Sequence, residues 1–147
     1  MGTVLFRILL VDDFAPWRQV VSSMLSMKKE LQVVGEASDG PEAVGKAVEL
    51  RPDLILLDIG MPTMNGIEAA RQIRKLVPES KIIFLSQESS DDVIQEAINV
   101  GASGYVIKSM AGSDLLATLE SALSASGKQS QLGSVYGKPS EAAIQAD

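Results

Sequence analysis

Three carboxylates follow two short apolar segments of the chain. Asp12 and Asp13 directly follow Ile8–Val11. Asp58 directly follows Leu54–Leu57. A carboxylate placed just after an apolar strand lies at the C-terminal edge of that strand, where open parallel sheets bind ligands. If the three carboxylates converge there, a cation or bound protons must relieve their repulsion.

Two further polar side chains occupy equivalent places. Ser86 ends the apolar segment Lys81–Ser86, and Lys108 follows Tyr105–Ile107. Because all strands of a parallel sheet point the same way, these side chains should gather with the carboxylates at one edge. Three carboxylates, a hydroxyl and an ammonium group suit a divalent cation together with a phosphoryl group.

Each of these groups has a candidate role in such a site. Mg²⁺ takes one or two carboxylates plus phosphate oxygens, so Asp13 and Asp58 are candidate ligands, with Asp12 binding directly or through a water. The backbone carbonyl of Gly60 is a further candidate ligand. Asp58 is the candidate nucleophile, because a carboxylate can attack a phosphoryl donor and this one can lie in the middle of the group.

The elements that must position these residues alternate between two patterns. Strands are predicted at Arg7–Val11, Gln32–Ala37, Leu54–Leu57, Lys81–Ser86 and Tyr105–Ile107. Apolar residues at helical spacing lie between and after the strands, in Val20–Met27, Pro41–Leu50, Ile67–Val77, Val93–Ile98 and Leu115–Leu123. Ser90 is a candidate helix cap, and the third helix should end before Pro78. This alternation predicts an α/β domain with a parallel sheet covered on both faces.

Composition narrows the class of protein. The chain has 147 residues, a net charge of −6 and no Cys or His, which argues against general nucleic-acid affinity and excludes thiol chemistry and histidine ligands. No apolar stretch approaches the roughly 20 residues of a membrane span, so we expect a cytoplasmic protein that does not bind membranes.

Residues 6–124 should form the domain. Residues 125–147, rich in Gly, Ser, Gln and Lys, should form a linker or flexible tail, with a marginal helix at Ser140–Ala146.

Four motifs together carry a resemblance to a known family. They are Asp12-Asp13, Leu56–Pro62 with Asn65-Gly66, Leu85-Ser86 and Gly104–Lys108. In this order, over residues 6–124, they resemble the receiver domain of two-component response regulators. The resemblance implies a flavodoxin-like (βα)5 fold in three layers with strand order 2-1-3-4-5. It also implies phosphorylation of Asp58 by a sensor histidine kinase with Mg²⁺, assisted by Lys108 and Ser86.

The resemblance also implies how the domain signals. Ser86 and Tyr105 would form the switch, and Tyr105 would turn inward on activation. The surface of the fourth helix, fifth strand and fifth helix would then control an output, by homodimerisation or by release of an output domain. Gly104–Leu116 resembles the subfamily that carries a helix-turn-helix, so transcription is the expected output, and DNA would be bound only through a domain missing from this chain. Ser109 stands where many receivers have proline, which leaves the cis peptide often found there open.

Three other functions are alternatives to a phosphorylated receiver. An aspartyl-phosphate phosphatase or phosphotransferase would use similar groups, but its nucleophile normally precedes the acidic pair. A receiver that only binds protein would not need the complete set of site residues. A flavodoxin would need a phosphate-binding loop after the first strand, where this chain has acids. Trp17 could report on the site or cover apolar surface, and Gly66 and Gly101 are interpreted as turn residues with unusual dihedral angles.

Overall fold

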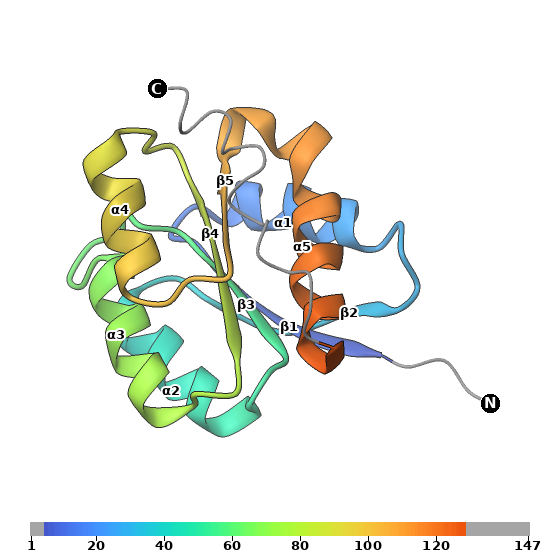
Figure 1. The fold of residues 1–147 in the computed structure, drawn as a ribbon, viewed down its shortest axis with the longest axis horizontal. Helices are drawn as coiled ribbons and strands as arrows, with labels where there is room; N and C mark the ends of the chain where they lie inside the picture. Colours follow the sequence, from blue (N-terminus) through green and yellow to red (C-terminus); the bar gives the residue numbers. More distant parts are fainter. Residues whose placement is uncertain (1–4, 129–147) are drawn as a thin grey trace.

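One parallel sheet forms the centre of the molecule (Figure 1). The structure is a computed structural model and describes residues 5–128. The strands are β1 (Phe6–Val11), β2 (Leu31–Ala37), β3 (Leu54–Leu57), β4 (Lys81–Ser86) and β5 (Gly104–Ile107). Their order is β2-β1-β3-β4-β5, and every neighbouring pair is parallel. The predicted strands and their order are therefore confirmed, with β1, β2 and β5 each beginning one residue earlier.

Helices cover both faces of the sheet. They are α1 (Ala15–Leu25), α2 (Gly40–Leu50), α3 (Gly66–Leu76), α4 (Asp91–Asn99) and α5 (Ala111–Lys128), with a short 3-10 turn, η1 (Lys108–Met110). In Figure 1, α1 and α5 lie on one side of the sheet and α2, α3 and α4 on the other. This is the flavodoxin-like three-layer (βα)5 architecture.

The core consists of two clusters, one on each face of the sheet. Alternate residues of β1 serve alternate faces: Ile8 and Leu10 pack under α1 and α5, whereas Leu9 and Val11 pack under the other three helices. This is the two-residue period of a strand. All four residues of β3 are buried, because this central strand is covered on both sides.

Local sequence explains where most helices begin and end. Ser90 caps α4, because its side chain accepts a hydrogen bond from the backbone N–H of Val93. Asn65 caps α3 in the same way. Helix α3 ends at Leu76, before Pro78, as predicted. These caps fix where each helix starts relative to the strand end before it.

Two helix C-termini, those of α1 and α5, differ from the sequence prediction by two residues or more. Helix α1 ends at Leu25, so Met27 lies beyond it and is 76% exposed, because the chain must already turn towards β2. Helix α5 continues to Lys128, so residues 125–128, which were assigned to the tail, are helical. A helix anchored by a buried face extends easily, since each further residue adds a backbone hydrogen bond. The rest of the expected tail, including Ser140–Ala146, lies outside the described residues.

The two glycines interpreted as turn residues behave differently. Gly101 has φ +95°, which is the left-handed region that glycine tolerates. The interpretation was wrong for Gly66, which is the first residue of α3 and has no positive φ. Its role is steric: a Cβ there would collide with the carbonyl oxygen of Asp58. The peptide after Lys108 is trans, as is every peptide bond that the structure describes.

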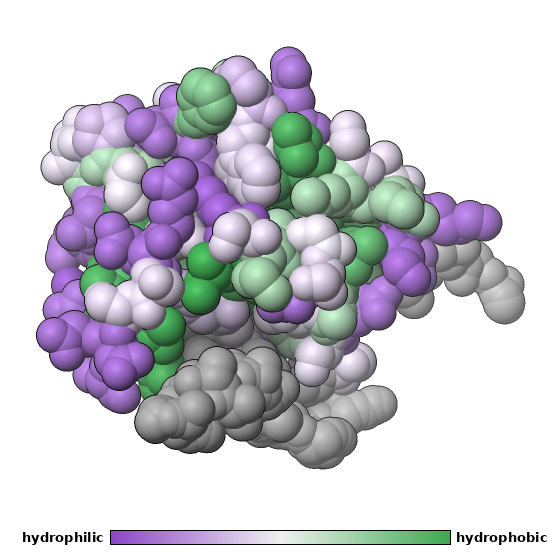
Figure 2. All heavy atoms as spheres, turned by 90° about the horizontal axis from the view of Figure 1, so that it is seen from above, coloured by the Kyte–Doolittle hydropathy of each residue, from purple (hydrophilic) through white to green (hydrophobic). Residues whose placement is uncertain are grey.

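Exposed hydrophobic side chains come from many elements of the described part of the chain. They are Leu5, Phe14, Val20, Met27, Val48, Leu76 and Met110. Figure 2 shows hydrophobic and hydrophilic residues mixed over the face seen from the top of Figure 1. Single apolar residues at a surface are ordinary for a folded domain. Within residues 5–128, no helix is long and apolar enough to cross a membrane.

Candidate functional site

The register of the sheet brings the acidic residues together. Val11 pairs with Leu57, so the residues that follow them, Asp12 and Asp58, leave neighbouring strands at the same level. The N–H of Asp58 donates to the carbonyl of Val11 at 3.0 Å, which joins the two strand ends. One carboxylate oxygen from each of Asp12, Asp13 and Asp58 lies within 4.8 Å of the others. The predicted convergence is therefore observed.

The three carboxylates differ in their surroundings. Asp12 and Asp58 are buried, at 4% and 6% exposure, whereas Asp13 is exposed. Burial raises the pKa of Asp58, and the neighbouring charge of Asp12 raises it further. The ammonium of Lys108 and a hydrogen bond from the backbone of Gly60 act in the opposite direction. The negative charge of Asp58 is therefore unfavourable in the metal-free site, and a bound cation would stabilise it.

Lys108 is the counter-charge within this group. Its Nζ lies 2.6 Å from Oδ2 of Asp12 and 3.6 Å from Oδ2 of Asp58, and its side chain is 15% exposed. It also lies over the ring of Trp17, 5.6 Å from the ring centroid. Trp17 packs against the core under α1 and α5 as well, so it both covers apolar surface and borders the site.

Ser86 and Tyr105 meet at the loop that follows β4. Ser86 is buried, and its Oγ accepts a hydrogen bond from the N–H of Glu88 at 3.1 Å. The hydroxyl of Tyr105 donates to the carbonyl of Glu88 at 2.7 Å. Burial raises the pKa of Tyr105 to about 12, against a lowering hydrogen bond with Ser86. Tyr105 therefore stays a hydrogen-bond donor at neutral pH, held against the same loop as Ser86.

An open cleft at the carboxyl edge of the sheet joins these groups. Its lining residues are Asp12, Asp13, Phe14, Asp58, Gly60, Ser86, Gln87, Glu88 and Lys108. Tyr105 is absent from this lining, although its hydroxyl bonds to the carbonyl of Glu88, which is part of it. Phe14, which is 60% exposed, and Gln87 were not among the predicted site residues. They could have been predicted from the sequence, because they directly follow the predicted site residues Asp13 and Ser86.

The donor set fits a small hard cation. Carboxylate oxygens are the ligands that Mg²⁺ prefers; three carboxylates gather here, and two of them lie near the ammonium of Lys108. Asp12, Asp13 and Asp58 would hold the ion. Gly60 lines the cleft next to them, which keeps its carbonyl a candidate ligand.

We predict that Asp13→Asn weakens Mg²⁺ binding by about tenfold or more, because one of three charged ligands is lost. Titration calorimetry of the metal-free protein measures the affinity. Glu49→Gln is the matched control, since it removes the same charge from an exposed position in the C-terminal half of α2, away from the carboxyl edge of the sheet. Equal Mg²⁺ affinity in wild type and Asp13→Asn would contradict the metal site.

We predict that Asp58→Asn stabilises the metal-free fold at neutral pH. A pKa raised in the folded state means that the contribution of Asp58 to stability is present below the ordinary carboxyl pKa and is lost as pH rises through the folded pKa. Urea unfolding should therefore show the variant to be more stable than wild type at neutral pH, with the two converging in acid. A variant less stable than wild type at neutral pH would show that the charge of Asp58 does not destabilise the folded protein.

Comparisons with known proteins agree with this geometry. Residues 8–120 match the family model of the response regulator receiver domain. The response regulator protein VraR of Staphylococcus aureus is 39% identical over 109 residues, which cover 74% of this chain and 52% of VraR. The chain thus spans about half the length of the curated relatives it matches.

Solved structures share the fold. A LuxR-family two-component response regulator from Aurantimonas sp. SI85-9A1 has a TM-score of 0.81 at 29% identity, over 95% of this chain and 99% of that one. The response regulator domain of Thermotoga maritima CheB has a TM-score of 0.76 at 34% identity, over 82% and 97%. The fold, the strand-end residues and these matches together place the chain in the response regulator receiver family, and it is a signalling domain of that family.

Proposed function

We propose that this chain is a phosphorylation-controlled switch whose phosphoacceptor is Asp58. The donor is a sensor histidine kinase, and Mg²⁺ is the cofactor. The observation that carries the proposal is the convergence of Asp12, Asp13 and Lys108 on Asp58, with Ser86 in the same cleft. Family membership supports a cytoplasmic place of action and a role as phosphoacceptor rather than as an enzyme acting on other substrates.

The transfer uses the charges of the cleft. A carboxylate oxygen of Asp58 attacks phosphorus, forming a new P–O bond, while the bond from phosphorus to the donor breaks and its electron pair leaves with the donor. Lys108 and the Ser86 hydroxyl bind oxygens of the transferred group. Asp12, Asp13 and Asp58 would hold the Mg²⁺, which would supply positive charge to the transfer when bound.

Lys108 has to change partner in this step. Its ammonium is closer to Asp12 than to Asp58, at 2.6 Å against 3.6 Å. A cation bound by Asp12 would take over the neutralisation of that carboxylate. Lys108 would then be free to turn to the group on Asp58, so cation binding and phosphoryl binding support each other.

The phosphoryl group would reach the output surface through Ser86 and Tyr105. It adds roughly −1.5 to −2 charge and strong acceptor oxygens beside Ser86. Drawing Ser86 towards it disturbs the loop whose Glu88 carbonyl holds Tyr105. The surface of α4, β5 and α5 then changes by a shift between two populated states. On this proposal that surface controls homodimerisation or an output domain, and transcription is the output, with DNA bound only by that further domain.

We predict that Ser86→Ala retains a phosphoacceptor but uncouples Tyr105. In wild type, beryllofluoride with Mg²⁺ should shift the Tyr105 ring resonances, because the phosphoryl mimic reaches Tyr105 through Ser86 and the Glu88 loop. In Ser86→Ala the same addition should shift them much less. Ser113→Ala, an exposed hydroxyl on α5 that bonds only locally, is the control. Equal shifts in wild type and Ser86→Ala would remove Ser86 from the pathway.

Intact-mass spectrometry with acetyl phosphate tests the whole proposal. Wild type with Mg²⁺ should gain one phosphoryl group per chain, and removal of Mg²⁺ by a chelator should prevent it. Phosphate release measured in parallel separates this function from that of an enzyme. Rapid, continuous release of phosphate without a phosphorylated chain would instead indicate a phosphatase, and no reaction at all would indicate a receiver that only binds protein.

A further inference from the structure

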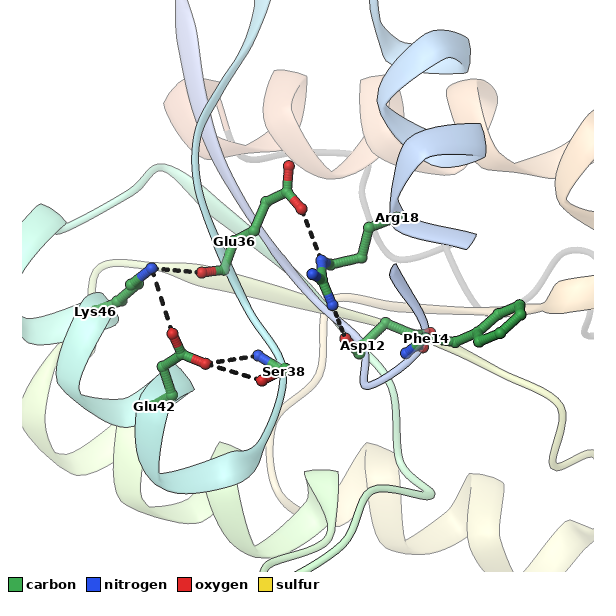
Figure 3. A network of polar contacts seen from close by, with 7 residues as sticks. All are labelled: Asp12, Phe14, Arg18, Glu36, Ser38, Glu42 and Lys46. Carbon is green, nitrogen blue, oxygen red and sulfur yellow. Dashed lines mark hydrogen bonds and ion pairs between the residues drawn. The ribbon is translucent and has the colours of Figure 1, made fainter. Parts of the chain in front are cut away.

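Arg18 connects the acidic cleft to the edge strand of the sheet (Figure 3). Its Nη1 donates to the backbone carbonyl of Asp12 at 2.5 Å, and its Nε donates to Oε1 of Glu36 in β2 at 2.6 Å. The arginine side chain is 17% exposed, whereas that of Glu36 is 46% exposed. Arg18 lies one turn into α1, and side chains tilt towards the N-terminus of their helix. Its guanidinium therefore folds back over the turn that carries the acidic pair.

The backbone of Asp12 is held on both sides by these contacts. Its N–H donates to the carbonyl of Ala37 at 3.0 Å, and its carbonyl accepts from Arg18. Its side chain is fixed separately, because Oδ1 accepts from the N–H of Phe14 at 2.9 Å and Oδ2 contacts Lys108. Arg18 is the only one of these partners that is itself anchored by an ion pair to β2.

We propose that Arg18 is a positioning residue for the cation site: by clamping the Asp12 backbone to β2 through Glu36, it holds the Asp12 carboxylate where the cation binds. The inference rests on the proposed function, since it concerns the same site. Arg18 does not line the cleft, and its guanidinium cannot be a ligand of a cation. It acts through Asp12, as residues behind a ligand commonly do.

The sign of the effect on Mg²⁺ affinity separates positioning from charge. Arg18 is a cation near a cation site, so its charge alone weakens Mg²⁺ binding and its removal would strengthen it. Its hydrogen bonds to Asp12 and Glu36 have the opposite effect, because they preorganise a ligand. Positioning therefore predicts weaker binding when Arg18 is replaced, even though a positive charge is lost.

Arg18→Gln and Arg18→Lys are the informative variants. Lysine keeps the charge but lacks the planar fork that reaches two acceptors at once. We expect both variants to bind Mg²⁺ about five- to tenfold more weakly than wild type in calorimetry. Lys46→Gln is the matched control: Lys46 contacts Glu36 and Glu42 at the far end of the network in Figure 3 and does not reach Asp12. Its Mg²⁺ affinity should equal that of wild type.

A measurement without metal keeps the result independent of phosphorylation. Hydrogen exchange at the Phe14 amide reports on the Asp12 turn, because that N–H donates to Oδ1 of Asp12. It should be faster in Arg18→Gln than in wild type and Lys46→Gln, at equal global stability in urea.

The outcomes that would overturn the inference are distinct from those that affect the proposed function. Tighter Mg²⁺ binding in Arg18→Gln, together with unchanged binding in Arg18→Lys, would show that Arg18 acts by charge alone. Unchanged exchange at Phe14 would show that Arg18 does not hold the turn. Failure of wild type itself to bind Mg²⁺ would overturn the proposed site as a whole.

Discussion

Asp58→Asn is expected to take no phosphoryl group from acetyl phosphate and Mg²⁺, whereas wild type takes one per chain. An uncharged amide is a far weaker nucleophile than a carboxylate, and it leaves the cleft with one fewer ligand for the cation. Asp12 is poorly placed to substitute, because Oδ1 accepts a hydrogen bond from Phe14 and Oδ2 contacts Lys108. Intact-mass spectrometry over a time course measures the loss.

Asp53→Asn is the matched control for this variant. Asp53 precedes β3 at its amino end just as Asp58 follows β3 at its carboxyl end, and it is exposed. Its carboxylate accepts a hydrogen bond from the N–H of Arg7, away from the cleft. If Asp53→Asn is phosphorylated to the same extent as wild type, an aspartate-to-asparagine change does not by itself prevent phosphorylation. Normal labelling of Asp58→Asn would mean that another carboxylate is the acceptor.

The predicted site depended on strand ends, and these were readable in the sequence. Leu54–Leu57 is apolar throughout and Asp58 interrupts it, so the end of β3 could be placed within a residue. A parallel sheet then forces the ends of β1 and β3 to one edge, whatever the loops do. The residues that depend only on topology, Asp12, Asp58 and Lys108, were therefore brought together as expected.

Contacts between side chains and the backbone, in contrast, could not be predicted from the sequence. Nothing in the spacing of Arg18 shows that it bonds to the carbonyl of Asp12, because that bond depends on a rotamer and on the height of α1 above the sheet. The contact between Tyr105 and the Glu88 carbonyl joins strand β5 to the loop after β4, whose path follows from packing. Helix ends without a strong cap were also misplaced, as at Met27, since the last turn is decided by the chain that follows.

The close contact at Gly66 was also not predictable from the sequence, and replacing this glycine is expected to have a large effect. It begins α3, and its N–H donates to the carbonyl of Ile59 at 2.8 Å. A Cβ at this position would overlap the carbonyl oxygen of Asp58 and approach the Cα of Ile59, both of which are backbone atoms that cannot rotate away. Glycine is therefore required because the start of α3 lies directly against the Asp58 peptide, and not because of a left-handed conformation.

Gly66→Ala is accordingly expected to lower the free energy of unfolding by about 3 kcal/mol, as overpacking against rigid neighbours does. Because the clash is with Asp58 itself, the variant should also lose phosphorylation by acetyl phosphate under conditions where it is still folded. Gly45→Ala is the control: it lies within α2 with nothing within 4 Å of the added Cβ. Its unfolding free energy should rise by about 0.5–1 kcal/mol, because alanine favours a helix. Chemical denaturation of both variants measures the contrast. Equal stability of Gly66→Ala and wild type would show that α3 can shift outward, and that the approach to Asp58 is not a constraint on the site.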